Sequence, residues 1–412
     1  MDATDLAPNP PQARAALQGL LRGFEAVRRT VPTALDPLAL QDALTTALLR
    51  IQVVVLAEER GLSVAPPPAN ESLVGLHEAL QHDARHDAAG LERRHGAWSN
   101  LLSRLRTVRE GNDSKTGPSH EGLDLFHLSP HPLLDEDAPP PVPDSCVLAV
   151  LNALRGGEHR HSGAGVVEHL GALYEGLKDF SLTPAPPDGR LLMRPSAARR
   201  TSGAHYTPRR LTRSVVEATL QPLLDDLGEH PTASQILGLK VCDPAMGCGA
   251  FLLEACRQLA DAVVSAWNEH GDGPPATRDD FVRSKARHLV AKRCLHGVDK
   301  DPRAVSLARL SLWLLASPTD CPRDTFAATL RWGDALVGRA NGPLDAALAS
   351  LTPPDTPPLH WDLAFPTVFS RPRPGFDAIL GNPPFLGGKR IRTTLGATWR
   401  SWLTALHPKA CG

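Results

Sequence analysis

Apolar residues in the first part of the chain recur at intervals of three and four positions, the spacing of one face of an α-helix. This spacing is seen in Leu17, Leu20, Leu21 and Phe24, and again in Leu44, Leu48, Leu49, Ile51 and Val55. Proline clusters interrupt the pattern at 66–68 and 139–143, where we expect loops. The pattern predicts a mainly α-helical region over 1–182.

The pattern of apolar residues changes after a polar, proline-containing stretch at 183–200, which we predict to be a linker. From residue 201 onward, short apolar segments are each followed by a loop and an amphipathic helix. The predicted strands are 236–242, 294–298, 327–332 and 376–380. Strands that alternate with helices predict an α/β fold with a parallel, doubly wound sheet, and such sheets bind ligands beyond the carboxyl ends of their strands.

Composition narrows the picture only a little. The 412 residues include 44 Lys and Arg against 45 Asp and Glu, so no global positive charge indicates nucleic acid, although a local basic face is enough to bind phosphates. We find no apolar run near the roughly 18 residues that span a bilayer, and no signal-like N-terminus. We therefore expect a cytoplasmic protein without a membrane partner.

Cysteine and histidine spacing does not predict a metal site. The 7 cysteines are an odd number without a C-x-x-C pair, so we expect reduced thiols, no disulfides and no zinc. The pairs His82/His86 and His127/His131 have helical i, i+4 spacing, but their surroundings are polar or broken by proline. We expect these histidines to be solvated.

The end of the first predicted strand combines an acidic residue with a glycine turn. Gly247 and Gly249 permit a tight turn and close approach of a ligand to the backbone, and a helix N-terminus follows. The turn lacks the Gly-Lys-Ser/Thr of a P-loop and the G-x-G-x-x-G spacing of dinucleotide sites. Asp243 at the strand tip repels phosphate and suits a cationic amino-acid ligand, although an ordinary strand-to-helix turn remains an alternative.

The next two strand ends each carry a carboxylate. Asp301 and Pro302 fit the N-cap and first turn of a helix, which leaves Asp299 without a capping role. Asp299 can accept hydrogen bonds from both hydroxyls of a ribose. Asp334 can accept from the amino group of an adenine ring, with a solvated loop aspartate as the alternative.

The fourth strand end, G-N-P-P-F, is the most specific. Two adjacent prolines remove two backbone donors and fix two φ angles where a strand leaves the sheet. Asn382 then offers a side-chain oxygen and Pro383 a backbone carbonyl, and together they can accept both hydrogens of an amino group.

Taken together, D-P-A-M-G-C-G-A-F, G-V-D-K-D-P, W-G-D-A and G-N-P-P-F resemble motifs I to IV of the amino-group DNA methyltransferases. Residues 203–208, G-A-H-Y-T-P, are similar to motif X of this family. Their place before motif I is the order of the gamma group, which includes the methylase halves of type IIG restriction enzymes. The resemblance covers about residues 165–400.

The resemblance implies a class I, Rossmann-like methyltransferase sheet over 201–412 and a site-specific transfer of methyl groups to adenine N6 in double-stranded DNA, in a restriction-modification or phage-defence system. The implied cofactor is S-adenosyl-L-methionine. Its methionine part would be held by Tyr206, Thr207, Pro208, Asp243, Pro244, Ala245, Gly247 and Gly249. Asp299 would hold the ribose and Asp334 the adenine. The catalytic loop around a flipped adenine would be Asn382, Pro383, Pro384 and Phe385.

Two features depart from the family pattern. The gap between Asp243 and Asp299 is longer than one connecting helix, so we expect an inserted helix or loop there. The chain ends soon after Phe385, so we expect a sheet that is incomplete at its C-terminus and needs a C-terminal partner fragment or target-recognition subunit. The alternatives are a non-catalytic fragment that binds cofactor or DNA for a partner chain, and a methyltransferase of RNA adenine or protein glutamine. We expect no nuclease in the N-terminal region.

Overall fold

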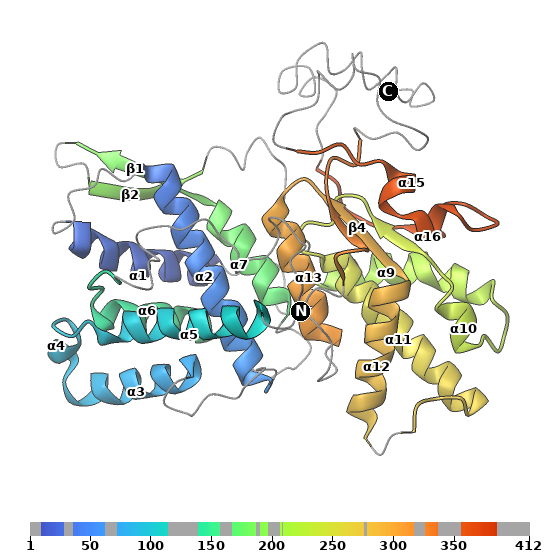
Figure 1. Cartoon of the computed structure of the whole chain (residues 1–412), viewed down its shortest axis with the longest axis horizontal. Helices are drawn as coiled ribbons and strands as arrows, with labels where there is room; N and C mark the ends of the chain where they lie inside the picture. The colour runs from blue at the N-terminus through green and yellow to red at the C-terminus, as the bar shows by residue number, and fades with distance from the viewer. Residues whose placement is uncertain are drawn as a thin grey trace, which may run out of the picture. The chain divides into compact units, whose positions relative to one another are not determined.

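The structure is a computed structural model, and it describes residues 10–28, 36–61, 72–113, 139–156, 167–186, 190–196, 207, 209–275, 278–316, 326–336 and 356–384. Contacts within the chain divide it into two compact units, Met1–Thr201 and Ser202–Gly412, which we call the helical unit and the sheet unit. Figure 1 labels many of the elements of both units, which are described separately below.

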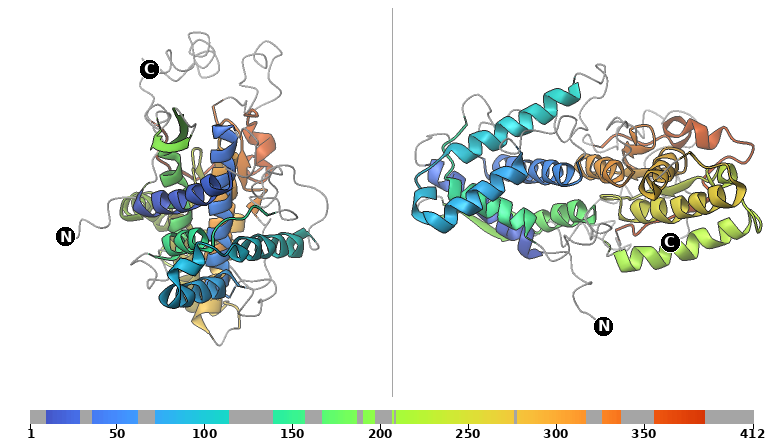
Figure 2. Two further views of the ribbon diagram at one scale, coloured as in Figure 1. Left: turned by 90° about the vertical axis from the view of Figure 1, so that its left-hand side faces the viewer. Right: turned by 90° about the horizontal axis from the view of Figure 1, so that it is seen from below.

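The helical unit consists mainly of helices, as the apolar spacing predicts. They are α1 (Pro10–Arg28), α2 (Pro37–Glu59), α3 (Leu73–His86), α4 (Ala88–Leu91), α5 (Gly96–Asp113), α6 (Asp144–Arg155) and α7 (Glu168–Lys178). Helix α1 packs along α6, while α2 contacts α3, α5 and α7 (Figures 1 and 2). The core between them contains Leu17, Leu44, Leu48 and Trp98, which are fully buried.

Helix α2 is buried on all sides, because every residue from Ala43 to Ala57 is buried. Asp36 begins it by accepting hydrogen bonds from the backbone N–H of Leu38 and Ala39, and Pro37 fits the first turn. Contrary to the sequence expectation, α2 is long and apolar enough to cross a membrane by length and composition: an 18-residue window has a mean hydropathy of 1.4. However, 78% of that window is buried, and the core helix of a soluble protein passes the same test.

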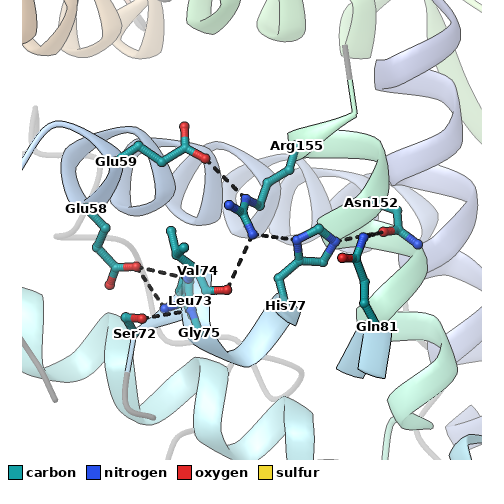
Figure 3. Close-up of polar contacts among 10 residues, drawn as sticks. All are labelled: Glu58, Glu59, Ser72, Leu73, Val74, Gly75, His77, Gln81, Asn152 and Arg155. Atoms are coloured by element: carbon teal, nitrogen blue, oxygen red, sulfur yellow. Dashed lines mark hydrogen bonds and ion pairs between the residues drawn. The ribbon is translucent and has the colours of Figure 1, made fainter. Parts of the chain in front are cut away.

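A polar network joins α2, α3 and α6 inside the helical unit (Figure 3). Glu58 on α2 accepts from the backbone N–H of Leu73 (2.8 Å) and Val74 (3.2 Å) at the start of α3. Its other oxygen accepts from Arg104 Nε at 2.8 Å, and both side chains of this ion pair are buried. Glu58 therefore satisfies two of the N–H groups that an α-helix leaves unpaired at its N-terminus.

A β-hairpin follows α7. Strands β1 (Phe180–Ala185) and β2 (Arg190–Pro195) pair antiparallel, so part of the segment predicted as a linker is regular structure. Gln41 on α2 holds β1 by donating to the Phe180 carbonyl at 2.7 Å and accepting from Leu182 N–H at 3.1 Å. Such contacts from distant side chains leave no signature in the local sequence.

The sheet unit alternates strands and helices. Its elements are α9 (Arg209–Asp225), α10 (Ala233–Ile236), β3 (Val241–Asp243), α11 (Ala250–His270), α12 (Asp279–Arg293), β4 (Leu295–Asp299), α13 (Pro302–Ala316), β5 (Leu330–Trp332), α15 (Trp361–Ala364), α16 (Pro366–Phe369) and β6 (Ala378–Ile379). Helix α11 packs between α9 and α12 (Figure 2). The extra connection predicted between Asp243 and Asp299 is confirmed, because α11 and α12 both lie there.

The four strands form one parallel sheet in the order β5-β4-β3-β6. In register, Val241 of β3 lies between Leu295 of β4 and Ala378 of β6. Val241 and Leu295 are fully buried, as expected for a parallel sheet that is covered by helices. The prediction of an α/β fold with a parallel sheet is confirmed.

The first predicted strand begins later than expected. Residues 233–236 form the short helix α10, because Thr232 and Gln235 make a reciprocal capping box. The strand itself covers only Val241–Asp243. Residues 327–329 likewise form a turn before β5, and β6 contains only Ala378 and Ile379.

Candidate functional site

The sheet brings four of the predicted site residues to one edge. Asp334 follows β5, Asp299 ends β4, Asp243 ends β3 and Asn382 follows β6. Because all four strands are parallel, these positions lie at the same edge of the sheet, in the order Asp334, Asp299, Asp243, Asn382. From β3 the chain proceeds outward to β4 and β5, and then returns to the other side of β3 as β6. The crevice of such a topological switch point is where open α/β sheets bind ligands.

The glycine turn after β3 needs its glycines. Gly247 and Gly249 have φ values of +52° and +86°, a region that side-chain-bearing residues rarely adopt. A Cβ on Gly249 would also lie 3.2 Å from Ala308 Cβ on α13. The backbone N–H groups of the turn are largely bound within the protein: Met246 N donates to the Val298 carbonyl, and Gly249 N to the Met246 carbonyl. The turn therefore shapes the site and offers few free N–H donors to a ligand. The sequence did not reveal that these N–H groups are bound within the protein.

Asp243 is a buried carboxylate that lacks a partner for one oxygen. Its side chain is only 1% exposed. Oδ1 accepts a hydrogen bond from Ala245 N–H at 3.0 Å, while Oδ2 is buried without any partner. Burial raises the pKa of Asp243 to about 7, the Ala245 hydrogen bond opposes this rise and the charge of Asp299 adds to it. An orphaned buried carboxylate oxygen is costly and fits a ligand that supplies a cationic donor.

Asp299 has a structural role that the sequence analysis did not assign to it. Its Oδ2 accepts from Gly247 N–H at 2.8 Å, and its Oδ1 accepts from Asp301 N–H at 2.9 Å. Asp299 therefore fixes the glycine turn of the neighbouring strand, in addition to the ribose-binding role that the resemblance implies. Asp301 caps α13 as predicted, because its Oδ1 accepts from Arg303 N–H at 3.0 Å. A carboxylate oxygen has more than one lone pair, so Asp299 can still accept from ribose hydroxyls.

Asp334 has no exposed surface at all, so it is not a solvated loop aspartate. Its Oδ1 accepts from Leu336 N–H at 2.9 Å. Its Oδ2 lies 2.6 Å from the ammonium group of Lys300, whose side chain is 53% exposed. Lys300 immediately follows Asp299, and the sequence analysis did not single it out.

Glycines outside the predicted set also shape the site. Gly381 has a φ of +152°, and a Cβ there would lie 2.8 Å from Asp243 Oδ1. The backbone before Asn382 therefore lies directly against the Asp243 carboxylate, because Leu380 N–H also donates to the Cys242 carbonyl. A Cβ on Gly297 would lie 2.8 Å from Leu252 Cδ1 and would also clash with Met246 Sδ. Gly381 directly precedes Asn382, and Gly297 lies two positions before Asp299. Their closeness to predicted site residues is the signal in the sequence that could have identified these two glycines.

Asn382 is held by a contact from another motif. Its Nδ2 donates to Thr207 Oγ1 at 3.4 Å, although 175 positions separate them. With Nδ2 directed at the hydroxyl, the amide oxygen of Asn382 remains an acceptor. Asn382, Pro383 and Pro384 are exposed. Tyr206, Pro208 and Phe385 lie outside the described residues.

Within the described ranges, no group of three or more His, Cys, Asp or Glu side chains could hold a metal ion. The described cysteines, Cys146, Cys242, Cys248, Cys256 and Cys294, are free thiols buried in the protein. His82 and His86 lie on α3 and are exposed, while His127 and His131 fall outside the described residues.

Comparisons with known proteins agree with the motif resemblance. Residues 293–404 match the family model described as Eco57I restriction-modification methylase. The chain is 28% identical over 229 residues to the adenine-specific methyltransferase PglX of Streptomyces coelicolor, covering 52% of this chain but 17% of that protein. The structure of the type IIL restriction-modification enzyme MmeI in complex with DNA matches with a TM-score of 0.41 and 18% identity, over 74% of this chain and 36% of that chain. The family model and the PglX relative confirm the predicted resemblance to adenine methyltransferases of the restriction-modification type.

Proposed function

Starting from a chain that resembles the adenine methyltransferases of restriction-modification systems, we propose that it transfers a methyl group from S-adenosyl-L-methionine to the N6 of a specific adenine in double-stranded DNA. The observation that carries this proposal is the order of the four strand ends. Asp334, Asp299, Asp243 and Asn382 follow one another along the sheet edge. This is the order of adenine, ribose, methionine and methyl acceptor in the assigned roles.

The residues at the sheet edge fit the cofactor. The unpartnered Oδ2 of Asp243 would accept a hydrogen bond from the ammonium group of the methionine part, which supplies the missing positive donor. Asp299 would bind the ribose hydroxyls and Asp334 the adenine amino group. Thr207 would lie beside the methionine part, with Tyr206, Pro208, Pro244, Ala245, Gly247 and Gly249 around it. We propose the class I methyltransferase fold for the sheet unit on the same basis.

The catalytic step needs positioning more than acid–base chemistry. When bound, the cofactor supplies a methyl group on a positively charged sulfur, which leaves as a neutral thioether. The adenine amino group is a poor nucleophile, because its lone pair is delocalised into the ring. The Asn382 side-chain oxygen and the Pro383 carbonyl accept hydrogen bonds from the two N–H groups of the adenine amine. These hydrogen bonds direct the lone pair of the nitrogen at the methyl carbon. As the N–C bond forms, the nitrogen releases one proton to solvent.

The geometry of the catalytic loop supports this role. Thr207 holds the Nδ2 end of Asn382, so the oxygen end is the one available for the target. Pro383 and Pro384 limit the rotation of the loop backbone. The target adenine must leave the duplex to reach such a loop, and Pro384 and Phe385 would provide a face for the flipped base.

Substrate and partners of the whole protein are part of this proposal, since the chain spans 17% of the length of the relative that it matches. A DNA substrate, rather than RNA adenine or protein glutamine, is supported by the restriction-modification character of the family model. The alternative is that the chain binds the cofactor but needs a partner fragment for catalysis. The test below distinguishes this alternative, because it measures cofactor binding and methyl transfer separately.

The test measures cofactor binding and methyl transfer separately. We expect the 412-residue chain to bind S-adenosylhomocysteine in calorimetry, and to transfer labelled methyl groups to DNA adenine, alone or with a supplied C-terminal fragment. Asn382→Ala should lower methyl transfer by about a hundredfold and leave cofactor binding unchanged, because it removes one acceptor used in the transition state. Asn268→Ala, at an exposed position on α11, is the matched control. Label found only in RNA or protein, or no cofactor binding, would overturn the proposal.

A further inference from the structure

The first two turns of helix α9 carry three arginines, and their surroundings differ. Arg209 is bound within the protein, because its Nε donates to the buried carboxylate of Glu254 on α11 at 3.3 Å. Arg210 and Arg213 are exposed, and neither side chain makes a hydrogen bond or an ion pair with the residues that the structure describes. The protein therefore compensates the charge of one arginine and leaves two charges at the surface.

Arg210 and Arg213 do not stabilise the helix that carries them. The N-terminal end of an α-helix has a partial positive charge, so acidic residues are favourable there and cations are unfavourable. The first turn of α9 has no acidic residue. Arg210 lies in this turn, and Arg213 directly follows it. Positive charges that weaken the helix and lack a partner in the described part of the chain indicate an external partner of negative charge.

Both arginines lie close to the proposed catalytic loop. Thr207, two positions before α9, accepts a hydrogen bond from Asn382 Nδ2 at 3.4 Å. The start of the helix is also held from α11, where Gln258 donates to the Arg213 carbonyl at 3.2 Å. Successive Cα atoms are about 3.8 Å apart, so the Arg210 Cα lies at most about 11 Å from that of Thr207. Arg213 follows Arg210 by three positions, and both therefore lie on one face of α9.

We propose that Arg210 and Arg213 bind backbone phosphates next to the target adenine and hold that stretch of DNA against the catalytic loop. This inference rests on the proposed function, because it takes Asn382 as the residue that meets the target base. Each strand of duplex DNA carries a phosphate about every 3.4 Å of helix axis, so several phosphates lie within roughly 11 Å of any nucleotide. A guanidinium group donates two parallel hydrogen bonds to a phosphate. Such contacts position the DNA without reading its sequence.

The distribution of charge along the chain makes such a local contact necessary. Lys and Arg number 44 against 45 Asp and Glu, so the protein has no overall positive charge that would attract DNA. Exposed cations elsewhere in the sheet unit lack the same location. Lys292, for example, is exposed in the last turn of α12, where β4 begins, and thus lies at the edge of the sheet opposite Asn382. Lys292 therefore offers a control for charge without position.

The experiment measures how the binding of DNA to the full chain depends on salt. The probe is a fluorescent duplex with one adenine opposite an abasic position, which leaves the duplex readily, and S-adenosylhomocysteine is present. Each phosphate contact adds about 0.9 to the slope of log K against log salt. We expect Arg210→Gln and Arg213→Gln each to lower this slope by about one and to weaken binding by roughly tenfold. Lysine at both positions, which keeps the charge, should retain the slope.

A second probe locates the contact on the DNA. In this duplex, uncharged methylphosphonates replace the phosphates that flank the adenine. The wild type should bind the second probe more weakly than the first and with a smaller slope. The double variant Arg210→Gln/Arg213→Gln should bind both probes alike, because it has already lost the contact. Equal losses in the two proteins would show that the arginines do not bind these phosphates, and would overturn the proposal.

The controls keep the inference separate from the proposed function. Lys292→Gln should leave the salt slope unchanged, and the arginine variants should bind S-adenosylhomocysteine as the wild type does. A wild-type slope in both single arginine variants would overturn the inference. If the wild type binds S-adenosylhomocysteine but neither duplex, the inference fails and the cofactor site stands. If it binds neither the cofactor product nor DNA, the proposed function fails as well.

Discussion

Each unit of the chain contains a buried carboxylate, and the two differ in their hydrogen bonding. In the helical unit, Glu58 accepts from Leu73 N–H and Val74 N–H (Figure 3), and its other oxygen accepts from Arg104 Nε, so both of its oxygens are occupied by the protein. In the sheet unit, Asp243 accepts one hydrogen bond, and its Oδ2 has none. A carboxylate that the protein satisfies stabilises the fold, whereas one left short of donors is available to a ligand.

The electrostatics of the two carboxylates differ in the same way. Glu58 faces the Arg104 guanidinium, which compensates its charge at 2.8 Å. Asp243 has no cation in contact among the described residues, and burial raises its pKa to about 7. Mutations at the two positions should therefore have opposite effects on stability.

The largest effect should come from breaking the satisfied carboxylate. Glu58→Ala leaves a buried Arg104 and two N–H groups of α3 unpaired, and it should lower the free energy of unfolding by about 3–5 kcal/mol. Urea unfolding followed by circular dichroism measures this loss. Glu59→Ala is the control, because Glu59 is 25% exposed and pairs with Arg155 at the edge of the network. Equal losses for the two variants would contradict the structural role of Glu58.

The opposite result is expected for the unsatisfied carboxylate. In the folded protein Asp243 holds its proton up to pH about 7, whereas the unfolded chain releases it near the ordinary value of 3.8. The contribution of Asp243 to stability is thus present below pH 3.8 and lost as the pH rises through 7. Asp243→Asn removes this loss and should raise the free energy of unfolding by about 2 kcal/mol at pH 8, with little change at pH 4.

The same variant should lose ligand affinity. Asn cannot offer a negative charge to an ammonium group, so S-adenosylhomocysteine should bind at least about tenfold more weakly. Asp226→Asn, an exposed position after α9, should alter neither stability nor binding. A variant that is less stable than the wild type at pH 8, or that binds the ligand normally, would show that Asp243 is a structural carboxylate like Glu58.

The sequence was sufficient for the parts of the site that depend on local structure. A strand followed by Asp243 and a glycine turn, or by Asn382 and two prolines, is a local feature, and parallel strands bring such ends together without further information. The start of the first strand was mispredicted, although Thr232 and Gln235 already have the spacing of a capping box. The apolar residues Ile236, Leu237 and Leu239 favour a strand, and this pattern outweighs the capping signal.

Contacts between distant segments could not be predicted in this way. The Thr207–Asn382 hydrogen bond spans 175 positions, and the close approach of Gly381 to Asp243 depends on the pairing of β3 with β6. The ion pair of Lys300 with Asp334 likewise requires β4 to lie beside β5. Strand order determines the last two contacts, and hydrophobic periodicity does not reveal strand order.

A smaller effect sharpens the comparison at Asp243. If its carboxylate binds the cofactor ammonium, binding must release the proton that the free site holds. The affinity for S-adenosylhomocysteine should therefore rise roughly tenfold between pH 5.5 and pH 7, where the ligand amine stays charged. Calorimetry in buffers of different ionisation enthalpy should detect the released proton, and Asp243→Asn should abolish the dependence. If the affinity of the wild type does not depend on pH, Asp243 does not bind the ammonium group of the cofactor.

The smallest expected effect on stability involves His77, which belongs to the polar network of Glu58 in the helical unit. Its Nδ1 faces Arg155 Nη1 at 2.5 Å, so it accepts, and its Nε2 donates to Asn152 Oδ1 at 2.7 Å (Figure 3). Burial lowers the pKa of His77, the Asn152 hydrogen bond opposes this and the Arg155 charge adds to it. The stability from neutral His77 is present above pH 6.5 and falls as the pH drops, since the unfolded chain takes up a proton first.

Between pH 7 and pH 5.5 this loss should be about 0.5 kcal/mol, because the unfolded chain takes up its proton over this interval more completely than the folded protein does. His77→Gln should make urea unfolding less sensitive to pH over that interval. His82→Gln, at an exposed position on the same helix, should not change the pH dependence. If His77→Gln leaves the pH dependence of unfolding unchanged, the network tolerates a positive charge at His77. The partners of Glu58 would then matter for stability, and those of His77 would not.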